Sequence, residues 1–198
     1  MGPWLTKDVL AVADLKVLGL CGSLRMGSYN RLLLRAAKEL APPGVAIDEY
    51  QGLREIPPYD DDVRVGEGYP PPVVELRRRI ALADALLIAM PEYNFGPPGV
   101  LKNAIDWVSR PALDSPLRFK PVALMGASTG RMGTVRAQLA LRQNLGYLES
   151  YVLLKPEVLV SGAAAAFDED GRLNDETVRT LVGQLLAGLV VWARKVGS

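Results

Sequence analysis

The sequence predicts a single α/β domain built on a five-stranded parallel sheet with helices on both faces. The chain of 198 residues is long enough for one full-sized core. Its 49% hydrophobic and 23% charged residues are typical of an ordinary globular protein. Short apolar runs alternate with segments of helical periodicity, and this alternation favours a parallel sheet with right-handed crossovers. No repeat or linker divides the sequence, so we expect one domain over residues 1–198, with a core from about 16 to 195.

Residues 1–69 contain two of the expected strands. Residues 16–21 form an apolar run that is typical of a buried strand. Asn30 is expected to cap the following helix, which Pro-Pro-Gly at 42–44 ends. The apolar face of that helix is expected to consist of Leu33, Ala36, Ala37 and Leu40. Residues 45–50 alternate as a strand near an edge, and 51–69, rich in Pro, Gly and Asp, is expected to be a long irregular loop.

The rest of the chain, from residue 70 onward, continues the alternation of helices and strands. Three prolines at 70–72 favour a helix start, and the arginines at 77–79 are expected on its solvated face. Strands are expected over 84–90 and 121–127, and a last strand over 151–154 and 158–160, with Pro156 as the point of interruption. Helices are expected over 100–108, over a segment with Val135, Leu139, Arg142 and Leu145 at helical spacing, and at the end of the chain, where Asn174 is the expected cap.

Five strands in so short a chain favour the flavodoxin-like form, with strand order 2-1-3-4-5. In such open sheets ligands bind at the carboxyl ends of the strands, at the point where the strand order reverses. Here that point lies between the first and third strands. The segments 22–30 and 91–96 follow these two strands, so we expect them to meet at one ligand site.

The segment 22–30 has the composition of a phosphate-binding loop. Gly22 and Gly27 allow the backbone to approach a ligand closely, and the next helix directs its free N–H groups at the same place. Arg25 supplies a fixed charge that can bind phosphate through two hydrogen bonds. Further polar groups come from Ser23, Ser28 and Asn30. Ser-Tyr at 28–29 stands where a P-loop needs Lys and then Ser or Thr, and the loop alone is also compatible with an ordinary polar turn.

Two further loops are suited to a planar polar ring. In 91–96, Asn94 can both donate and accept hydrogen bonds, while Tyr93 or Phe95 can pack near a ring. Small residues over 127–133 permit close approach to the same ligand. Each loop alone is equally compatible with a simple connection. Three such loops at one sheet edge indicate a flavin mononucleotide (FMN) site.

Composition excludes several classes of function. The chain has no histidine, which removes His-based metal sites, Ser-His-Asp triads and Cys-His pairs. A net charge of +1 argues against a nucleic-acid surface. No metal site is expected, and the aspartates at 60–62 are interpreted as a solvated loop. The lone Cys21 is expected to be a small buried group. Since the sequence shows no signal peptide and no membrane span, we expect a cytoplasmic protein.

Taken together, these motifs resemble those of the NADPH-dependent FMN reductases, a flavodoxin-like family that includes chromate, quinone and azo-dye reductases. The resemblance covers nearly the whole chain, from about Lys16 to Trp192. It is carried by Gly-Ser-Leu-Arg at 22–25 with Ser28 and Asn30, Pro-Glu-Tyr-Asn at 91–94, Gly-Val-Leu-Lys-Asn-Ala-Ile-Asp-Trp at 99–107, and Ser-Thr-Gly at 128–130 with Gly133.

The resemblance implies a set of cofactor-binding residues. It implies that the FMN phosphate is held in the loop formed by Ser23, Arg25, Ser28, Tyr29 and Asn30. It implies that the isoalloxazine ring lies beside Pro91, Glu92, Tyr93, Asn94 and Phe95, with Ser128, Thr129 and Gly130 also near it. No catalytic side chain is assigned, because the flavin carries the chemistry.

The resemblance also implies a reaction and an assembly. A hydride from NADPH, or from NADH, passes through FMN to a small acceptor: free flavin, a quinone, an azo compound or a metal oxyanion such as chromate. Candidate cations for the 2′-phosphate of NADPH are Arg131, Arg118 and Arg54. Family members are commonly homodimers or homotetramers, and Lys102, Asp106 and Trp107 lie off the apolar stripe of their helix, as an interface would require. A salt-bridged solvent face fits these three residues equally well.

Two other functions are compatible with the fold. A flavodoxin-type electron carrier would bind FMN and serve protein partners, but such carriers are usually strongly acidic. A structural or regulatory protein would keep the fold without turnover, and the intact phosphate loop argues against it.

Overall fold

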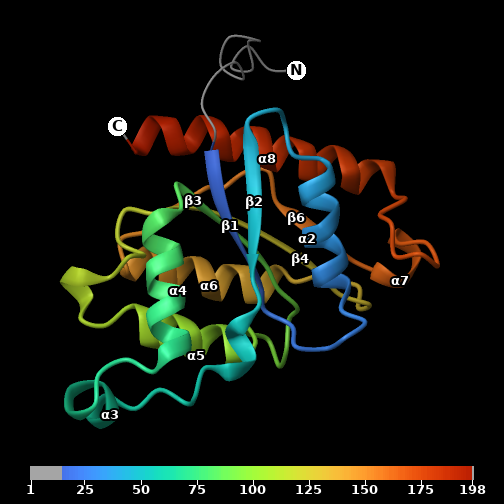
Figure 1. The fold of residues 1–198 in the computed structure, drawn as a ribbon. Coiled ribbons are helices and arrows are strands. Elements are labelled where there is room, and N and C mark those ends of the chain that lie inside the picture. The colour runs from blue at the N-terminus through green and yellow to red at the C-terminus, as the bar shows by residue number, and fades with distance from the viewer. Residues whose placement is uncertain (1–14, 198) are drawn as a thin grey trace.

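The parallel sheet occupies the centre of the protein. The computed structural model describes residues 15–197 (Figure 1). Its strands are β1 (Leu15–Cys21), β2 (Val45–Tyr50), β3 (Ala85–Ala89), β4 (Pro121–Ala127), β5 (Tyr151–Val152) and β6 (Val158–Val160). All pair in parallel in the order β2-β1-β3-β4-β5, with β6 also paired to β4. The predicted fold class and strand order are confirmed.

The predicted last strand is divided into two short pieces. β5 pairs with the beginning of β4, and β6 pairs with its end, where Val160 lies opposite Ala127. Pro156 stands between the pieces and has no N–H to give to a ladder, so the interruption expected from the sequence is confirmed. β6 consequently ends beside the carboxyl end of β4, where it supports the loop that follows β4.

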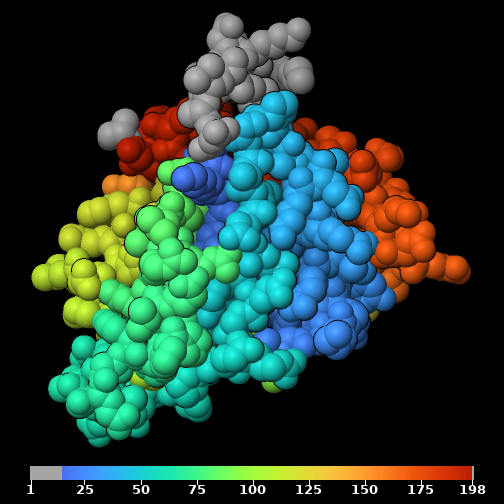
Figure 2. Space-filling view, in the orientation of Figure 1, coloured from blue at the N-terminus to red at the C-terminus, as the bar shows by residue number. Residues whose placement is uncertain are grey.

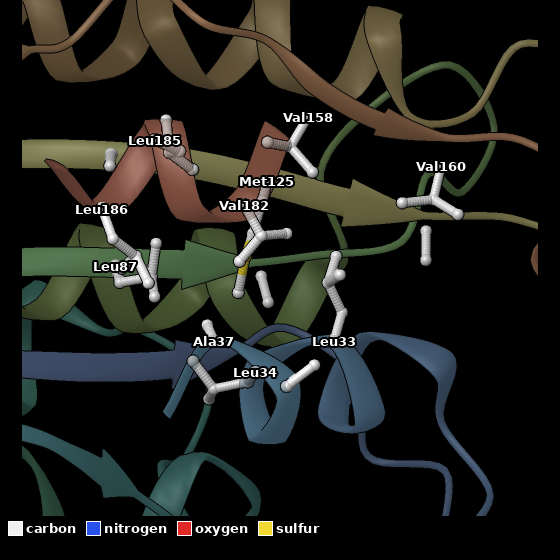
Figure 3. Close-up of a cluster of buried hydrophobic side chains, with 14 of the residues drawn as sticks. Leu33, Leu34, Ala37, Leu87, Met125, Val158, Val160, Val182, Leu185 and Leu186 are labelled. Atoms are coloured by element: carbon white, nitrogen blue, oxygen red, sulfur yellow. The ribbon is translucent and has the colours of Figure 1, made fainter. Parts of the chain in front are cut away.

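Helices cover both faces of the sheet. The longer ones are α2 (Tyr29–Glu39), α4 (Pro71–Leu82), α5 (Gly99–Val108), α6 (Val135–Tyr147) and α8 (Glu176–Val196). The short ones are η1 (Gly52–Glu55), α3 (Asp61–Gly66), η2 (Ala112–Asp114) and α7 (Ala163–Ala166). The helices α2 and α8 bury their apolar stripes on one face of the sheet, and α4, α5 and α6 on the other. Figure 3 shows Leu33 and Leu34 of α2 and Leu185 of α8 in the first of these two cores.

Two helix caps differ by one or two residues from the sequence prediction. Ser28, not Asn30, caps α2, since its side chain accepts a hydrogen bond from the N–H of Arg31. Asp175, not Asn174, caps α8 and accepts from Val178. Both prediction errors arose because several good capping residues stand together, and composition alone does not choose among them.

The segment 51–69 is more ordered than the sequence suggested. Asp60 caps the short helix α3, and the two aspartates that follow lie in its first turn, where the helix dipole favours negative charge. Figures 1 and 2 show α3 projecting from the body at the end where β1 and β2 have their carboxyl ends. The expected irregular loop therefore contains two short helices, η1 and α3, and lies at the end of the sheet where the candidate site is expected.

The orientation of some side chains on α4, α5 and α6 was also predicted wrongly. Leu139 is 56% exposed, and the buried side of α6 is formed by Ala137, Gln138, Leu141 and Leu145. Arg77 and Arg79 are largely covered, because they bind the 108–114 segment and Asp48 respectively. Trp107 is fully buried and its Nε1 donates to the carbonyl of Pro57 at 2.8 Å, so it is not available for an interface.

Candidate functional site

Asn30 joins two of the predicted ligand loops. Its amide nitrogen donates to the carbonyl of Ala127 at 2.9 Å, and its amide oxygen accepts from the N–H of Ala127 at 2.8 Å. The side chain is buried and spans 97 positions in sequence. Asn30 therefore fixes the phosphate loop against the end of β4. The sequence marked Asn30 as important but assigned its side chain to the phosphate, whereas here the amide is occupied by the protein backbone.

The phosphate loop collects hydrogen-bond donors around the first turn of α2. Ser28 accepts from the N–H of Arg31, and Ser23 accepts from the N–H of Arg25, so each hydroxyl hydrogen remains to donate. The N–H groups of Tyr29 and Asn30 precede the first hydrogen bond of α2 and have no acceptor among the described residues. The loop thus presents the donor set that an anion requires.

Close packing behind this loop explains its first glycine. A Cβ on Gly22 would lie 3.1 Å from Cβ of Met90 and 3.2 Å from a methyl group of Leu101. The N–H of Gly22 donates to Ala89 at 2.8 Å, which continues the pairing of β1 with β3 beyond the strand. Side chains and backbone are therefore closely packed below the loop, at the point between β1 and β3 where the strand order reverses.

Arg25 and Tyr29 line the outer side of the loop. The guanidinium of Arg25 donates to the carbonyl of Gly27 and lies 5.6 Å from the ring of Tyr29. That ring stacks on Phe167 at a centroid distance of 5.8 Å. Tyr29 is therefore fixed by packing. Arg25 is held by its own loop, because its Nε and one Nη group donate to the carbonyl of Gly27.

The second loop is a tight hairpin in an uncommon conformation. Tyr93 and Gly96 exchange two backbone hydrogen bonds, of 3.1 and 3.0 Å. Between them Asn94 and Phe95 have φ angles of +50° and +68°, which is the left-handed pair of a two-residue hairpin turn. Such angles are uncommon for residues other than glycine. The turn presents the ring of Phe95, 69% exposed, and that of Tyr93, 50% exposed, on the surface.

Glu92 anchors this hairpin to the start of α6. Its carboxylate, 5% exposed, accepts from the N–H of Arg136 at 2.9 Å and of Ala137 at 3.1 Å, and pairs with the Arg136 guanidinium. Burial opposes ionisation, but the hydrogen bonds from Arg136 and Ala137 outweigh it and hold the pKa of Glu92 below its ordinary value. The guanidinium also lies 3.7 Å from the centre of the Phe95 ring. No local sequence pattern indicated this role for Arg136.

Glycines shape the loop that follows β4. A Cβ on Gly126 would lie 2.1 Å from Oγ1 of Thr134 and 2.5 Å from the carbonyl oxygen of Met90. Gly133 has a φ of +56° and lies against the backbone of Leu159. The chain can therefore turn back over β4 and β6 in a compact curve that side chains would block.

An open cleft of about 370 Å³ lies between the hairpin and this third loop. Its lining is formed by Glu92, Asn94, Phe95, Ser128, Gly130, Arg131, Met132, Gly133 and Arg136. Five of the residues named from the sequence thus line one cleft: Glu92, Asn94, Phe95, Ser128 and Gly130. Ser23, Arg25, Ser28, Tyr29, Asn30, Pro91, Tyr93 and Thr129 do not line it; the first five form the phosphate loop, Pro91 is buried, and Tyr93 and Thr129 are exposed.

Comparison with known proteins assigns the chain to a family. The sequence model of the NADPH-dependent FMN reductases matches residues 15–165. An NAD(P)H-dependent FMN reductase of Pseudomonas aeruginosa is 51% identical over 183 residues, covering 92% of this chain and 97% of that protein. A quinone reductase of Escherichia coli K12 is 41% identical over 175 residues, with 87% and 93% coverage. The chain belongs to the NADPH-dependent FMN reductase family.

A solved structure supports the same assignment. The flavoenzyme NAD(P)H:(acceptor) oxidoreductase FerB of Paracoccus denitrificans superposes with a TM-score of 0.83 at 32% identity, over 92% of this chain and 98% of FerB. As a member of the NADPH-dependent FMN reductase family, the protein is an FMN-dependent NAD(P)H oxidoreductase, as the sequence predicted. The flavodoxin-type carrier receives no support.

The hydrogen-bond donors of the phosphate loop fit the phosphate of FMN, the cofactor of this family. A phosphate needs N–H and O–H donors, and the first turn of α2 supplies them together with two buried hydroxyls. Across residues 15–197, no cluster of three or more His, Cys, Asp or Glu side chains is placed to hold a metal ion. Within the same residues, no helix is both long and apolar enough to cross a membrane.

Proposed function

We propose that the protein transfers a hydride from NAD(P)H to a quinone through FMN held by the three loops at the carboxyl edge of the sheet. One observation carries this proposal. Asn30 fixes the phosphate loop to the end of β4, directly before the loop that forms one wall of the cleft. The proposed phosphate-binding turn and the cleft beside the aromatic hairpin are therefore joined at the carboxyl edge of the sheet.

The phosphate of FMN would be bound by the first turn of α2. The N–H groups of Tyr29 and Asn30 and the hydroxyls of Ser23 and Ser28 donate to it, and Arg25 supplies the positive charge. For this, Arg25 exchanges its present bond to the carbonyl of Gly27 for the phosphate. Tyr29 forms the outer wall of the loop and is supported by Phe167.

The ring of FMN would lie against the hairpin and the loop after β4. Pro91, Glu92, Tyr93, Asn94 and Phe95 border it on one side, and Ser128, Thr129 and Gly130 on the other. In this proposal Glu92 acts through the backbone, because its carboxylate is already bound to α6. Bound FMN supplies hydride transfer, so no side chain of the protein is needed as a catalytic acid or base.

A quinone is the acceptor class that the cleft fits best. Phe95 and Met132 offer exposed apolar surface beside it, and both are more than half exposed. Such surfaces bind flat aromatic rings. Relatives support this choice: besides the enzyme of Escherichia coli, a 2-hydroxy-1,4-benzoquinone reductase of Burkholderia is 36% identical over 180 residues.

The proposal also covers the oligomeric state of the protein and its location in the cell. We propose a homodimer or homotetramer, in which a hollow between α5 and α6 takes part in the subunit contact. Lys102 and Asp106, which form an ion pair, line this hollow together with Tyr147, which is 83% exposed. Light scattering on the purified protein measures the assembly directly, and a monomer at micromolar concentration would refute this part. We also propose a cytoplasmic location, which cell fractionation tests.

The reaction is tested with the protein, FMN and NADPH in the absence of oxygen. We expect flavin absorbance to stay with the protein on gel filtration, to bleach within seconds of NADPH addition, and to return when a benzoquinone is added. Bound flavin that neither NADPH nor NADH bleaches would refute the reductase. Bleached flavin that the quinone does not reoxidise would refute the acceptor class alone.

The phosphate assignment is tested with the double variant Ser23→Ala, Arg25→Ala. It removes one hydroxyl donor and the fixed charge, so we expect FMN affinity to fall by about a hundredfold. Met26→Ala, in the same loop and 89% exposed, is the matched control and should bind FMN normally. Unchanged FMN affinity in the double variant would show that the phosphate binds elsewhere.

A further inference from the structure

Arg131 has no partner in the described part of the chain. Across residues 15–197 its side chain makes no hydrogen bond, ion pair or ring contact, and it lines the cleft. The other arginine of the cleft, Arg136, is paired with the buried carboxylate of Glu92. Among the residues that line the cleft, Arg131 therefore carries the uncompensated positive charge.

The helix end nearest the cleft is already occupied. The N-terminus of α6 would attract an anion, but the carboxylate of Glu92 accepts from the N–H groups of Arg136 and Ala137 there. A diphosphate usually binds where several backbone N–H groups are free. This helix end does not offer them, so a side-chain cation is left as the anion receptor of the cleft.

We propose that Arg131 binds the 2′-phosphate of NADPH and thereby sets the preference of the enzyme for NADPH over NADH. The inference rests on the proposed function, in which the nicotinamide donor enters this cleft. A phosphate monoester carries nearly two negative charges and matches the planar fork of a guanidinium. Quinones carry no fixed charge, so the acceptor does not require Arg131.

The two other candidate arginines already bind other groups of the protein. Arg118 pairs with Glu149 and stacks on Phe119, just before β4 begins, at the edge of the sheet opposite the cleft. Arg54 donates to the carbonyl of Leu24 at 2.9 Å and so braces the phosphate loop. The structure thus separates three arginines that the sequence could not rank.

Arg131→Gln tests the assignment, with Arg131→Lys as the variant that keeps the charge and Arg118→Gln as the matched control. Calorimetry on the FMN-loaded protein compares 2′,5′-ADP, which carries the 2′-phosphate, with 5′-AMP, which lacks it. We expect Arg131→Gln to weaken 2′,5′-ADP binding about tenfold and to leave 5′-AMP unchanged. Arg131→Lys should lose less, and Arg118→Gln should match the wild type.

Steady-state rates give the second readout. In Arg131→Gln the ratio of kcat/KM for NADPH to that for NADH should fall about tenfold through a higher KM for NADPH, with NADH and quinone kinetics unchanged. A wild-type enzyme that uses both nucleotides equally, or an equal loss for both in the variant, would overturn the inference while the proposed reductase stands. A wild type that oxidises neither nucleotide would refute the proposed function itself.

Discussion

The two sides of the proposed flavin site are held in place by different forces. The phosphate loop is fixed mainly by neutral hydrogen bonds, above all the two between Asn30 and the backbone of Ala127, with a further bond from Arg54 to the carbonyl of Leu24. The aromatic hairpin is fixed by charge, through Glu92 and Arg136, and by a turn whose central residues are left-handed. Neutral bonds keep their strength at any pH, whereas the charged anchor depends on ionisation. The two bonds of Asn30 are therefore independent of pH, whereas the anchor of the hairpin weakens when Glu92 is protonated.

The largest effect on stability is expected from Asn30→Asp. A carboxylate cannot donate to the carbonyl of Ala127 and would repel it in a buried place. We expect the free energy of unfolding of the flavin-free protein to fall by about 3 kcal/mol in urea titration. FMN affinity should fall as well, because the loop and the end of β4 separate.

A second amide provides the matched control. Asn103 also uses both ends of its amide, accepting from Tyr59 and donating to Pro57, but it is half-buried and far along the chain from the phosphate loop. Asn103→Asp should cost less stability, because water can solvate the new charge, and should leave FMN affinity unchanged. Equal losses of affinity in both variants would mean that Asn30 has no special place in the site.

The next effect is expected from Glu92→Gln, which keeps the shape but removes the charge. The pair loses its ionic hydrogen bonds, and we expect a loss of about 1–2 kcal/mol at pH 7. Because the folded protein lowers the pKa of Glu92, ionisation adds stability above the unfolded pKa of about 4.3, and this is lost as pH falls through the folded value. The difference between wild type and variant in thermal unfolding should therefore shrink below about pH 4. A difference that stays constant down to pH 3 would contradict the charged anchor.

The contrast between the two sides also shows what the sequence could predict. Strand order, loop positions and the importance of 22–30 follow from apolar runs and from glycine, serine and asparagine at strand ends, all of which are local signals. The partners of Asn30 and Glu92 lie 97 and about 44 positions away, and no local pattern announces them. Trp107 shows the same limit: it lies off the apolar stripe of its helix, yet a carbonyl in the segment before α3 allows its burial.

The smallest effect on stability is expected between two variants of Phe95 in the hairpin. Phe95→Ala removes the contact with Arg136 but keeps a left-handed residue, whereas Phe95→Gly removes the contact and relieves the backbone. We expect the glycine variant to be more stable than the alanine variant by about 1 kcal/mol in urea titration. At Met26, an exposed loop residue of the phosphate loop outside the left-handed region, alanine should be at least as stable as glycine.

The same pair of variants separates the geometry of the hairpin from its aromatic surface. Both variants lose the exposed ring of Phe95 equally, so both should raise the KM for a quinone if the ring contacts it. A further difference between them in quinone turnover would report the shape of the turn alone. If alanine proves as stable as glycine or more so, the left-handed turn does not persist in solution. The ion pair of Glu92 and Arg136 would then stabilise the start of α6 rather than the hairpin.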